Sequence, residues 1–591
     1  MRVWIGLLCG MSFVHAIAQA AAPSQDQIRD SAARAIALLQ TSQKNWYSKI
    51  NCHSCHHQFQ PAMAFRVARA HGVPVDETIA HADAVKAYAF TDLDAAVQYR
   101  DVQETVMDLG YSLVAANATG LEPNLASNVL ARLVAGRQDS SGRWDDLHQR
   151  PPQSYSNFTQ TAIGLRAIQL YSHPSQKADV AARVARARAW LLTHRPRDTE
   201  ERTWQMIGLT WAGGNDRSVL TKAAQELAAA QHADGGWSSI EGRESDAYST
   251  GEVLVALHEA GGIPVTDPRW RKGVEYLVSK QAPDGSWHVA SRLHPPAQVS
   301  PAYFESGYPY GHDQYLSASA ASYAIMALSY APGGSGGAAV PMWKEDVGGV
   351  EPWAETVLFG SAADLKKLLD GGFDPNSATK SGGTTALMMA TPDAEKVKIL
   401  IARGANVNAR AKSGFSALMI SALYRDGTAA AQALLARGAE AAGTPSPLML
   451  ATTVGNAAIL APLHDAGAPL ERTLVAAVRV GKLEAVRSLL DIGAKVDEPD
   501  GADTTPLERA VLANETEIAR LLIAHGANVN HVGRTGMTPL LYAASIDYGD
   551  STMIDLLLKS GARKDALTKE GASAIDLARK YGNTHLLAAL R

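Results

Sequence analysis

Apolar positions recur with helical spacing through the first part of the chain. Alanine- and leucine-rich segments place apolar side chains three and four residues apart, which is the period of one face of an α-helix. These segments form pairs, at residues 25–42 with 58–71, 79–98 with 101–117, 123–138 with 157–171, 178–194 with 201–213, 217–231 with 246–260, and 267–281 with 314–330. Because about six helical hairpins suffice to close on themselves, the pattern predicts an all-α fold that begins with an α6/α6 ring.

A second helical pattern, with a shorter period of about 27 to 33 residues, follows residue 341. Its clearest copies open near Asp503 and Gly536 with Thr-Pro-Leu, and they close with paired leucines before Gly-Ala. Weaker copies open near Pro352, Gly383, Gly414, Pro445, Arg472 and Gly571. The pattern resembles ankyrin repeats, which implies a curved solenoid of about eight repeats over residues 350–591 that binds an unidentified protein.

In the first array a glutamine stands six residues before a tryptophan at four places: Gln40 and Trp46, Gln138 and Trp144, Gln231 and Trp237, Gln281 and Trp287. A glycine stands two residues before the tryptophan in three of them, at Gly142, Gly235 and Gly285, and Lys44 replaces it in the first. This spacing resembles the QW motif of squalene and hopene cyclases, whose α/α-toroid fold is shared by the β subunits of protein prenyltransferases. The resemblance covers residues 24–330 and implies an α6/α6 toroid there, with each tryptophan beginning a loop between helices.

The residues that carry chemistry in those two families are missing here. The cyclases need an Asp-x-Asp-Asp acid, whereas residues 92–95 read Asp-Leu-Asp-Ala. The prenyltransferases bind zinc through aspartate, cysteine and histidine ligands, and residues 245–249 and 313–316 lack them at the matched positions, although Asp246 is adjacent. We therefore do not expect prenyl transfer by zinc chemistry.

The sequence Cys52-His53-Ser54-Cys55-His56 has the spacing of covalent haem c attachment. Two thiols one helical turn apart can bond the two vinyl groups, and the following imidazole can reach the iron. The motif predicts haem c held by Cys52 and Cys55, with His56 as an axial ligand. Two alternatives are a Cys52–Cys55 disulfide, and a zinc site that uses both thiols with His53, His56 or His57.

A closed ring would bring the segment from residue 288 to 313 beside the Cys-x-x-Cys-His motif. That segment contains three candidates for a second axial ligand, His288, His294 and His312, and aromatic residues that could cover a porphyrin, Tyr303, Phe304, Tyr308 and Tyr310. Met63 is less suited, because it lies two turns beyond His56 on the same predicted helix. Met107 is another possible ligand, but it belongs to the next predicted helix pair. The N-termini of the inner helices should also gather at one mouth of the ring, with His56, His57, Asn157, Gln160, Asp246, His312 and Asp313.

Residues 1–20 have the pattern of a signal peptide: Arg2, an apolar stretch from Val3 to Ile17, and a small-x-small site at residues 18–20. Its removal would also remove Cys9 and leave an exported chain, periplasmic or secreted. No later segment has the eighteen or so apolar residues that span a bilayer. With 55 basic and 59 acidic residues and no basic run, the composition favours neither a nucleic-acid partner nor an anionic membrane surface.

The stretch at residues 331–341, rich in glycine, serine and proline, is the expected linker between the two arrays. Together the motifs predict an exported ankyrin scaffold with a haem-c-bearing toroid, for redox sensing or electron transfer. One alternative is a toroid enzyme, acting on an apolar or prenyl-like substrate or through an open haem iron. Another is a non-catalytic scaffold with a Cys52–Cys55 disulfide.

Overall fold

The computed structural model describes residues 22–49, 54–99, 106–145, 152–153, 156–214, 216–292, 305–331, 337–546 and 550–591. The predicted signal peptide, Cys52 and His294 lie outside these ranges. Within them the regular structure is helical, and extended pairing is limited to isolated bridges such as Leu121 with Trp343. The prediction of an all-α chain is confirmed. No helix in the described ranges is long and apolar enough to cross a membrane.

The helices of the N-terminal array follow the predicted pairs closely. They are α1 (Gln25–Lys49), α2 (Gln60–Ala70), α3 (Glu77–Tyr88), α4 (Leu93–Val97), α5 (Tyr111–Ala118), α6 (Leu125–Ala135), α7 (Asn157–Tyr171), α8 (Lys177–Thr193), α9 (Thr199–Ala212), α10 (Arg217–Ala229), α11 (Ala247–Glu259), α12 (Pro268–Lys280) and α13 (Gln314–Ser329). Two π-helical turns, Cys55–Phe59 and Val106–Gly110, lead into α2 and α5. Short 3-10 turns at Pro174–Gln176 and Gly311–Asp313 precede α8 and α13.

The helix predicted at residues 79–98 is divided into α3 and α4. Phe90 has a φ of 43°, in the left-handed region, which ends the first helix. The Asp92 side chain accepts a hydrogen bond from the backbone N–H of Ala95 at 2.9 Å and starts the second. An aspartate before a new helical turn is a recognisable N-cap, and this sequence signal outweighs the continuous apolar pattern.

Six helices of the N-terminal array contact one another in a closed cycle. α2 packs against α5, α5 against α7, α7 against α9, α9 against α11, α11 against α13, and α13 returns to α2. Every residue of α13 is buried. The remaining long helices pack beside the members of this cycle, and the last of them, α12, contacts the first, α1.

Three of the four glutamine–tryptophan spacings form the same turn. Each tryptophan Nε1–H donates to a carbonyl ten residues earlier, at Val134, Leu227 and Leu277. Each glutamine Nε2 donates to the carbonyl of the turn glycine and to a carbonyl of a neighbouring helix, at Arg183, Arg269 and Ser31. Because Ser31 lies on α1, the last of these turns joins the end of the array to its beginning.

The first spacing is an exception to the predicted turn. Gln40 and Trp46 both lie inside α1, so Trp46 does not begin a loop. Gln40 instead donates to the backbone carbonyl of Asp76 at 2.8 Å and accepts from the Asp76 N–H at 3.1 Å. Lys44 stands where the other copies have a glycine with positive φ, and without that glycine the helix continues.

Substituting a turn glycine tests how closely the neighbouring helices approach each other. Gly285 has a φ of +93°, and an added Cβ would lie 2.7 Å from the carbonyl carbon of Arg34 on α1. We expect Gly285→Ala to lower the free energy of unfolding by about 2–4 kcal/mol, measured by urea denaturation, because it adds a steric clash to backbone strain. Gly262→Ala is the matched control, since Gly262 also has positive φ but nothing within 4 Å, and it should cost about 1 kcal/mol. Equal losses would contradict the close approach of α12 and α1.

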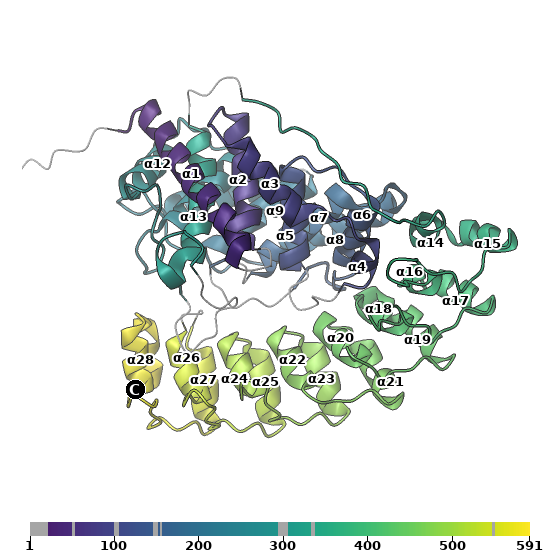
Figure 1. Ribbon diagram of the computed structural model, residues 1–591. Helices are drawn as coiled ribbons and strands as arrows, with labels where there is room; N and C mark the ends of the chain where they lie inside the picture. Colours follow the sequence, from purple (N-terminus) through teal and green to yellow (C-terminus); the bar gives the residue numbers. More distant parts are fainter. Residues whose placement is uncertain are drawn as a thin grey trace, which may run out of the picture.

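Residues from Trp353 onward form a regular stack of helix pairs (Figure 1). The pairs are α14 (Ala354–Phe359) with α15 (Ala362–Asp370), α16 (Ala386–Ala390) with α17 (Ala394–Ala402), α18 (Ala417–Ala422) with α19 (Thr428–Leu435), α20 (Pro447–Val454) with α21 (Leu460–Asp465), α22 (Thr473–Arg479) with α23 (Leu483–Asp491), α24 (Pro506–Leu512) with α25 (Thr516–Ala524), α26 (Pro539–Ser545) with α27 (Thr552–Lys559), and α28 (Ala574–Lys580) with α29 (Leu587–Leu590). The first helix of each pair begins where the sequence pattern predicts a repeat to open. Thr505 and Thr538 cap their helices through side-chain oxygens.

The stack lies along one side of the N-terminal array, and the first helices of its pairs form the row nearest to it (Figure 1). The backbone N–H of Arg425 donates to the carbonyl of Gly136 at 2.8 Å, and Arg132 donates to the carbonyl of Leu358 at 3.1 Å. The chain just after the predicted linker is also packed, because Trp343 exchanges backbone hydrogen bonds with Gly120 and Glu122 at 3.0 and 2.8 Å. The two arrays therefore share an interface.

Candidate functional site

The Cys-x-x-Cys-His motif is described only in part. Cys52 and His53 lie outside the described residues, and Cys55 opens the π-helical turn that leads into α2, with its side chain not described. Ser54, His56 and His57 are buried, and His56 is 2 % exposed. The structure therefore places His56 in the protein interior. The state of the two thiols, and with it haem attachment, stays a prediction.

His56 and His57 contact each other through their rings. The two Nδ1 atoms are 2.8 Å apart, and Ser54 Oγ lies 2.6 Å from Nδ1 of His56. On the other side, Nε2 of His57 lies 3.2 Å from Ser306 Oγ, which donates to Oε1 of Gln314 at the start of α13. A continuous hydrogen-bonded chain thus runs from His56 to α13.

Aromatic rings enclose the two histidines. His57 stacks on Trp46 with ring centroids 4.5 Å apart, and Tyr315 lies 4.6 Å from the His56 ring. Tyr308 meets His57 edge-on at 6.1 Å. Burial lowers the pKa of His57 to about 3, so its imidazole is neutral at physiological pH.

The segment before α13 reaches this cluster through Ser306 and Tyr308. His288 is half exposed, and its Nε2 is 2.8 Å from the Asp313 carboxylate. His312 is exposed in the 3-10 turn before α13, and His294 lies outside the described residues. The structure thus describes two of the three candidate second ligands, and none of the contacts of His56 or His57 given above involves them.

A buried acid pair inside the N-terminal array was not anticipated. Glu200 on α9 accepts hydrogen bonds from Thr159 Oγ1 at 2.8 Å and Tyr248 Oη at 2.9 Å. Glu252 on α11 accepts from Trp204 Nε1 at 2.8 Å. The Glu200 and Glu252 carboxyl groups lie close enough for each to affect the pKa of the other.

Burial raises the pKa of this pair. Burial raises the pKa of Glu200 to about 8, and the Asp198 carboxylate adds to this shift. Burial and the Glu200 carboxylate raise the pKa of Glu252 well above its ordinary value. Burial also raises the pKa of Asp198 to about 7 and that of Asp246 to about 6. Asp246 was expected at the mouth of the ring, and its carboxylate caps α11 through the Ser249 N–H at 2.7 Å.

Sequence reasoning missed Glu200 and Glu252 for a physical reason. Glu200 follows the helix-capping Asp198, a position where acidic residues usually face solvent and complement the helix dipole. The two glutamates come close only because α9 and α11 pack side by side. Among the described residues, no group of three or more histidine, cysteine, aspartate or glutamate side chains is arranged to hold a metal ion.

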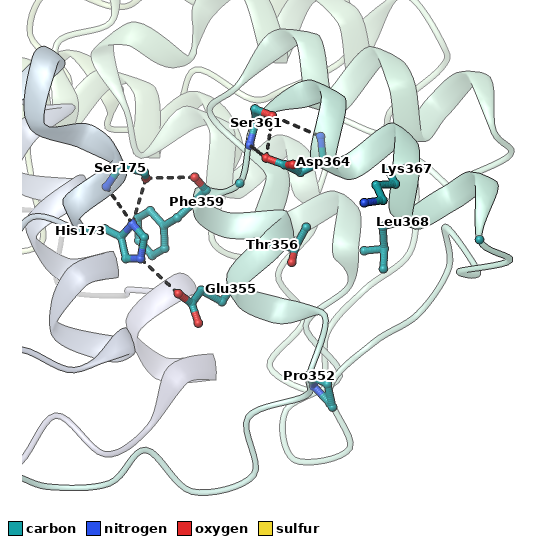
Figure 2. Close-up of a pocket in the computed structure, with 12 residues that line it drawn as sticks. His173, Ser175, Pro352, Glu355, Thr356, Phe359, Ser361, Asp364, Lys367 and Leu368 are labelled. Atoms are coloured by element: carbon teal, nitrogen blue, oxygen red, sulfur yellow. Dashed lines mark hydrogen bonds and ion pairs between the residues drawn. The ribbon is translucent and has the colours of Figure 1, made fainter.

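An open cleft of about 900 Å³ lies where the two arrays meet (Figure 2). His173 and Ser175 line it from the N-terminal array, and residues of α14 and α15 line the rest. His173 contacts Glu355 at 3.3 Å and stacks on Phe359, and Ser175 Oγ donates to the Phe359 carbonyl at 3.0 Å. These polar groups contact one another across the junction of the two arrays, so the cleft belongs to the interface between the arrays.

The haem prediction can be compared with the groups around His56. A histidine that binds a metal normally has its other ring nitrogen hydrogen-bonded to an acceptor, and Nδ1 of His56 meets Ser54 and His57 in this way. The surrounding aromatic rings provide an apolar wall. The described residues therefore fit an axial-ligand role for His56.

The stacked helix pairs after residue 353 define a helical repeat solenoid, a class of protein that presents an extended surface for binding. A family model described as "Ankyrin repeats (3 copies)" matches residues 355–445, 448–533 and 474–568. The chain belongs to the ankyrin-repeat family, as the relatives below also show.

Cyclin-dependent kinase inhibitor 2A of Homo sapiens is 30% identical over 119 residues, which are 20% of this chain and 74% of that protein. Cyclin-dependent kinase 4 inhibitor B of Rattus norvegicus is 32% identical over 111 residues, 19% of this chain and 83% of that protein. Neurogenic locus notch homolog protein 1 of Xenopus tropicalis is 29% identical over 186 residues, and the match spans 31% of this chain and only 7% of that protein.

Proposed function

We propose that this protein is an exported, protein-binding ankyrin scaffold whose N-terminal array is an α/α-toroid carrying haem c, and that it serves redox sensing or electron transfer. Cys52 and Cys55 would hold the haem and His56 would bind its iron from one side. The observation that carries the proposal is the placement of His56, one residue after Cys55 on the same turn, with Nδ1 hydrogen-bonded and the ring buried among aromatic side chains.

The toroid is supported by the cycle of contacts from α2 through α13 and by the glutamine–tryptophan turn that joins α12 to α1. In this arrangement each turn fastens one helix pair to a helix of the next pair, as Gln138 does by bonding the Arg183 carbonyl. Haem, when bound, would supply a one-electron redox centre. The described residues of the chain bury His56, orient its ring and keep water from it.

Attachment requires no oxidant, because each thiol adds its sulfur and its hydrogen across one vinyl double bond. We expect that expression with a haem c maturation system yields a chain whose haem mass survives denaturation and whose pyridine haemochrome spectrum shows thioether-linked haem. Cys52→Ser or Cys55→Ser should each leave one thioether at most, and the double variant should lose covalent haem altogether.

The alternatives give different results in the same experiment. A mature chain that stays haem-free and loses two protons within the Cys52–Cys55 peptide contains a disulfide, and the haem proposal is then wrong. A zinc ion that is bound to the reduced chain, and is lost in the double cysteine variant, would also contradict it. The control is His525→Gln, an exposed histidine of the ankyrin stack whose replacement should leave attachment unchanged.

A second candidate function is supported by the buried acid pair. Glu200 and Glu252 lie on two helices of the inner cycle, and both have raised pKa values. A proton shared by the two carboxyl groups would be a means of protonating an apolar or prenyl-like substrate. Polyprenyl alcohols and diphosphates should then be converted by the haem-free protein, and Glu252→Gln should abolish conversion. Turnover that persists in Glu252→Gln would contradict this role.

A further inference from the structure

The last residue of the hydrogen-bonded chain from His56, Gln314, fixes which atom donates and which accepts at each step of the chain. Oε1 of Gln314 accepts from Ser306 Oγ. A carboxamide oxygen can only accept hydrogen bonds, whereas a serine hydroxyl has a single proton to donate. The proton of Ser306 is therefore used in the bond to Gln314, and Ser306 must accept its other hydrogen bonds.

This direction extends to the histidines. Nε2 of His57 lies 3.2 Å from Ser306 Oγ and must donate to it, so Nε2 carries a proton. The His57 ring is fully buried, where an imidazole is neutral. A neutral imidazole with its proton on Nε2 has a lone pair on Nδ1. Nδ1 of His57 therefore accepts from Nδ1 of His56, at 2.8 Å.

We propose that His57 is a positioning residue that, through Ser306 and Gln314, holds the proton of His56 on Nδ1 and leaves the lone pair of His56 on Nε2. The inference rests on the proposed function and deepens it, because Nε2 is the atom through which His56 would bind the haem iron. The protein thus sets the required tautomer before any cofactor binds. Donation from His56 to a second imidazole also makes His56 a more electron-rich ligand.

The surrounding contacts keep the chain of bonds in place. Trp46 stacks on the His57 ring, so the ring cannot turn its nitrogens away from Ser306 and His56 without losing that contact. Ser42 Oγ on α1 lies 3.3 Å from both the backbone carbonyl oxygen and Oγ of Ser306, and the Tyr308 N–H donates to Ser306 Oγ at 3.2 Å. Helix α1, the turn before α2 and the start of α13 are all joined at this point.

The tautomers can be measured without haem. In the haem-free full-length chain labelled with ¹⁵N-histidine, long-range ¹H–¹⁵N spectra should show His56 protonated at Nδ1 and His57 protonated at Nε2, with assignment from His57→Gln. Ser306→Ala removes the acceptor of His57 and should shift both rings toward the other tautomer. Ser306→Thr retains a hydroxyl and should restore the parent tautomers. Ser48→Ala is a control, because Ser48 is exposed on α1 and its hydroxyl bonds the Asn45 carbonyl, so the bonds from His56 to Gln314 stay intact.

The haem-loaded protein gives a second measurement. Ser306→Ala and His57→Gln should weaken electron donation by His56 and raise the reduction potential, by about tenfold in the equilibrium constant, or about 59 mV for a one-electron couple. Ser306→Thr and the exposed control Ser48→Ala should keep the parent potential. Because Ser306→Ala retains both histidines, it also serves if His57→Gln fails to fold.

The outcomes separate this inference from the proposed function. If no haem attaches but the spectra show the expected tautomers, the positioning role stands and the haem proposal is wrong. If haem attaches but His56 is protonated at Nε2 in the haem-free chain, or Ser306→Ala leaves both tautomers and potential unchanged, the positioning role is wrong.

Discussion

Replacing Asp145 with alanine is expected to lower the free energy of unfolding by about 3–5 kcal/mol, because it leaves two cations of the ankyrin stack buried without their anion. Asp145 follows the second glutamine–tryptophan turn, and its side chain is 14% exposed. Its Oδ1 lies 2.7 Å from Lys482 Nζ and also contacts Arg425, whose side chains are 4% and 13% exposed. Although burial raises the pKa of Asp145, these two cations and Arg143 outweigh it and hold the pKa far below its usual value.

The measurement is urea denaturation followed by circular dichroism. The matched control is Asp426→Ala, which removes an ion pair with Arg183 across the same interface. Asp426 is 42% exposed, so its loss should cost about 0–1 kcal/mol. Combining Asp145→Ala with Lys482→Met should recover part of the loss, because an apolar side chain then replaces a buried cation that has lost the Asp145 carboxylate. A loss no greater than that of Asp426→Ala would show that the Asp145 cluster does not hold the arrays together.

Much of the fold could be predicted from the sequence because local periodicity carries it. Each helix pair of both arrays shows its own apolar spacing, and Thr-Pro or Gly-Ala marks the ends of the clearest ankyrin repeats. The sequence pattern did not predict the break at Phe90, because the helical spacing of apolar residues that starts at residue 79 continues across it. The first glutamine–tryptophan copy was misread because spacing was weighed above the absence of glycine at Lys44.

The interface and the buried acid pair could not be predicted in the same way. Asp145 contacts Lys482 and Arg425, which come from a distant part of the chain. Each of the three is a charged residue of a type that usually lies on the surface. The motif at Cys52 to His56 was visible because its members are adjacent in sequence. The partners of His57, Ser306 and Gln314, became visible only after the chain had been folded back beside its own beginning.

This packing changes how the ankyrin stack is understood. Ankyrin repeats are binding surfaces, and here the first helices of several repeats face the N-terminal array of the same chain (Figure 1). Asp94 of α4 accepts hydrogen bonds from Thr379 at 2.6 Å and from Ser381 and Thr384. Part of the surface that the repeats offer is thus already used inside the protein.

The acid pair makes the stability of the protein depend on pH. The pKa of Glu200 is raised from its ordinary value to about 8, so the folded chain keeps a proton that the unfolded chain releases. The stabilisation is fully present below the unfolded pKa, and it is lost as the pH rises through the folded pKa. We expect the free energy of unfolding to fall by about 3–4 kcal/mol between pH 5 and 8 from the raised pKa values of this pair.

Glu252→Gln tests this dependence directly. The substitution removes a carboxyl whose pKa is raised well above its ordinary value, so the folded chain no longer holds the proton of that group and the slope of stability against pH should decrease by up to about 1.4 kcal/mol per pH unit. Asp198, Asp246, Arg202 and Arg292 remain and keep their own contributions. Glu259→Gln, an exposed site on the same helix α11, should leave the slope unchanged. Parallel pH profiles for the parent and Glu252→Gln, measured by urea denaturation from pH 5 to 9, would mean that Glu252 does not hold this proton in the folded chain.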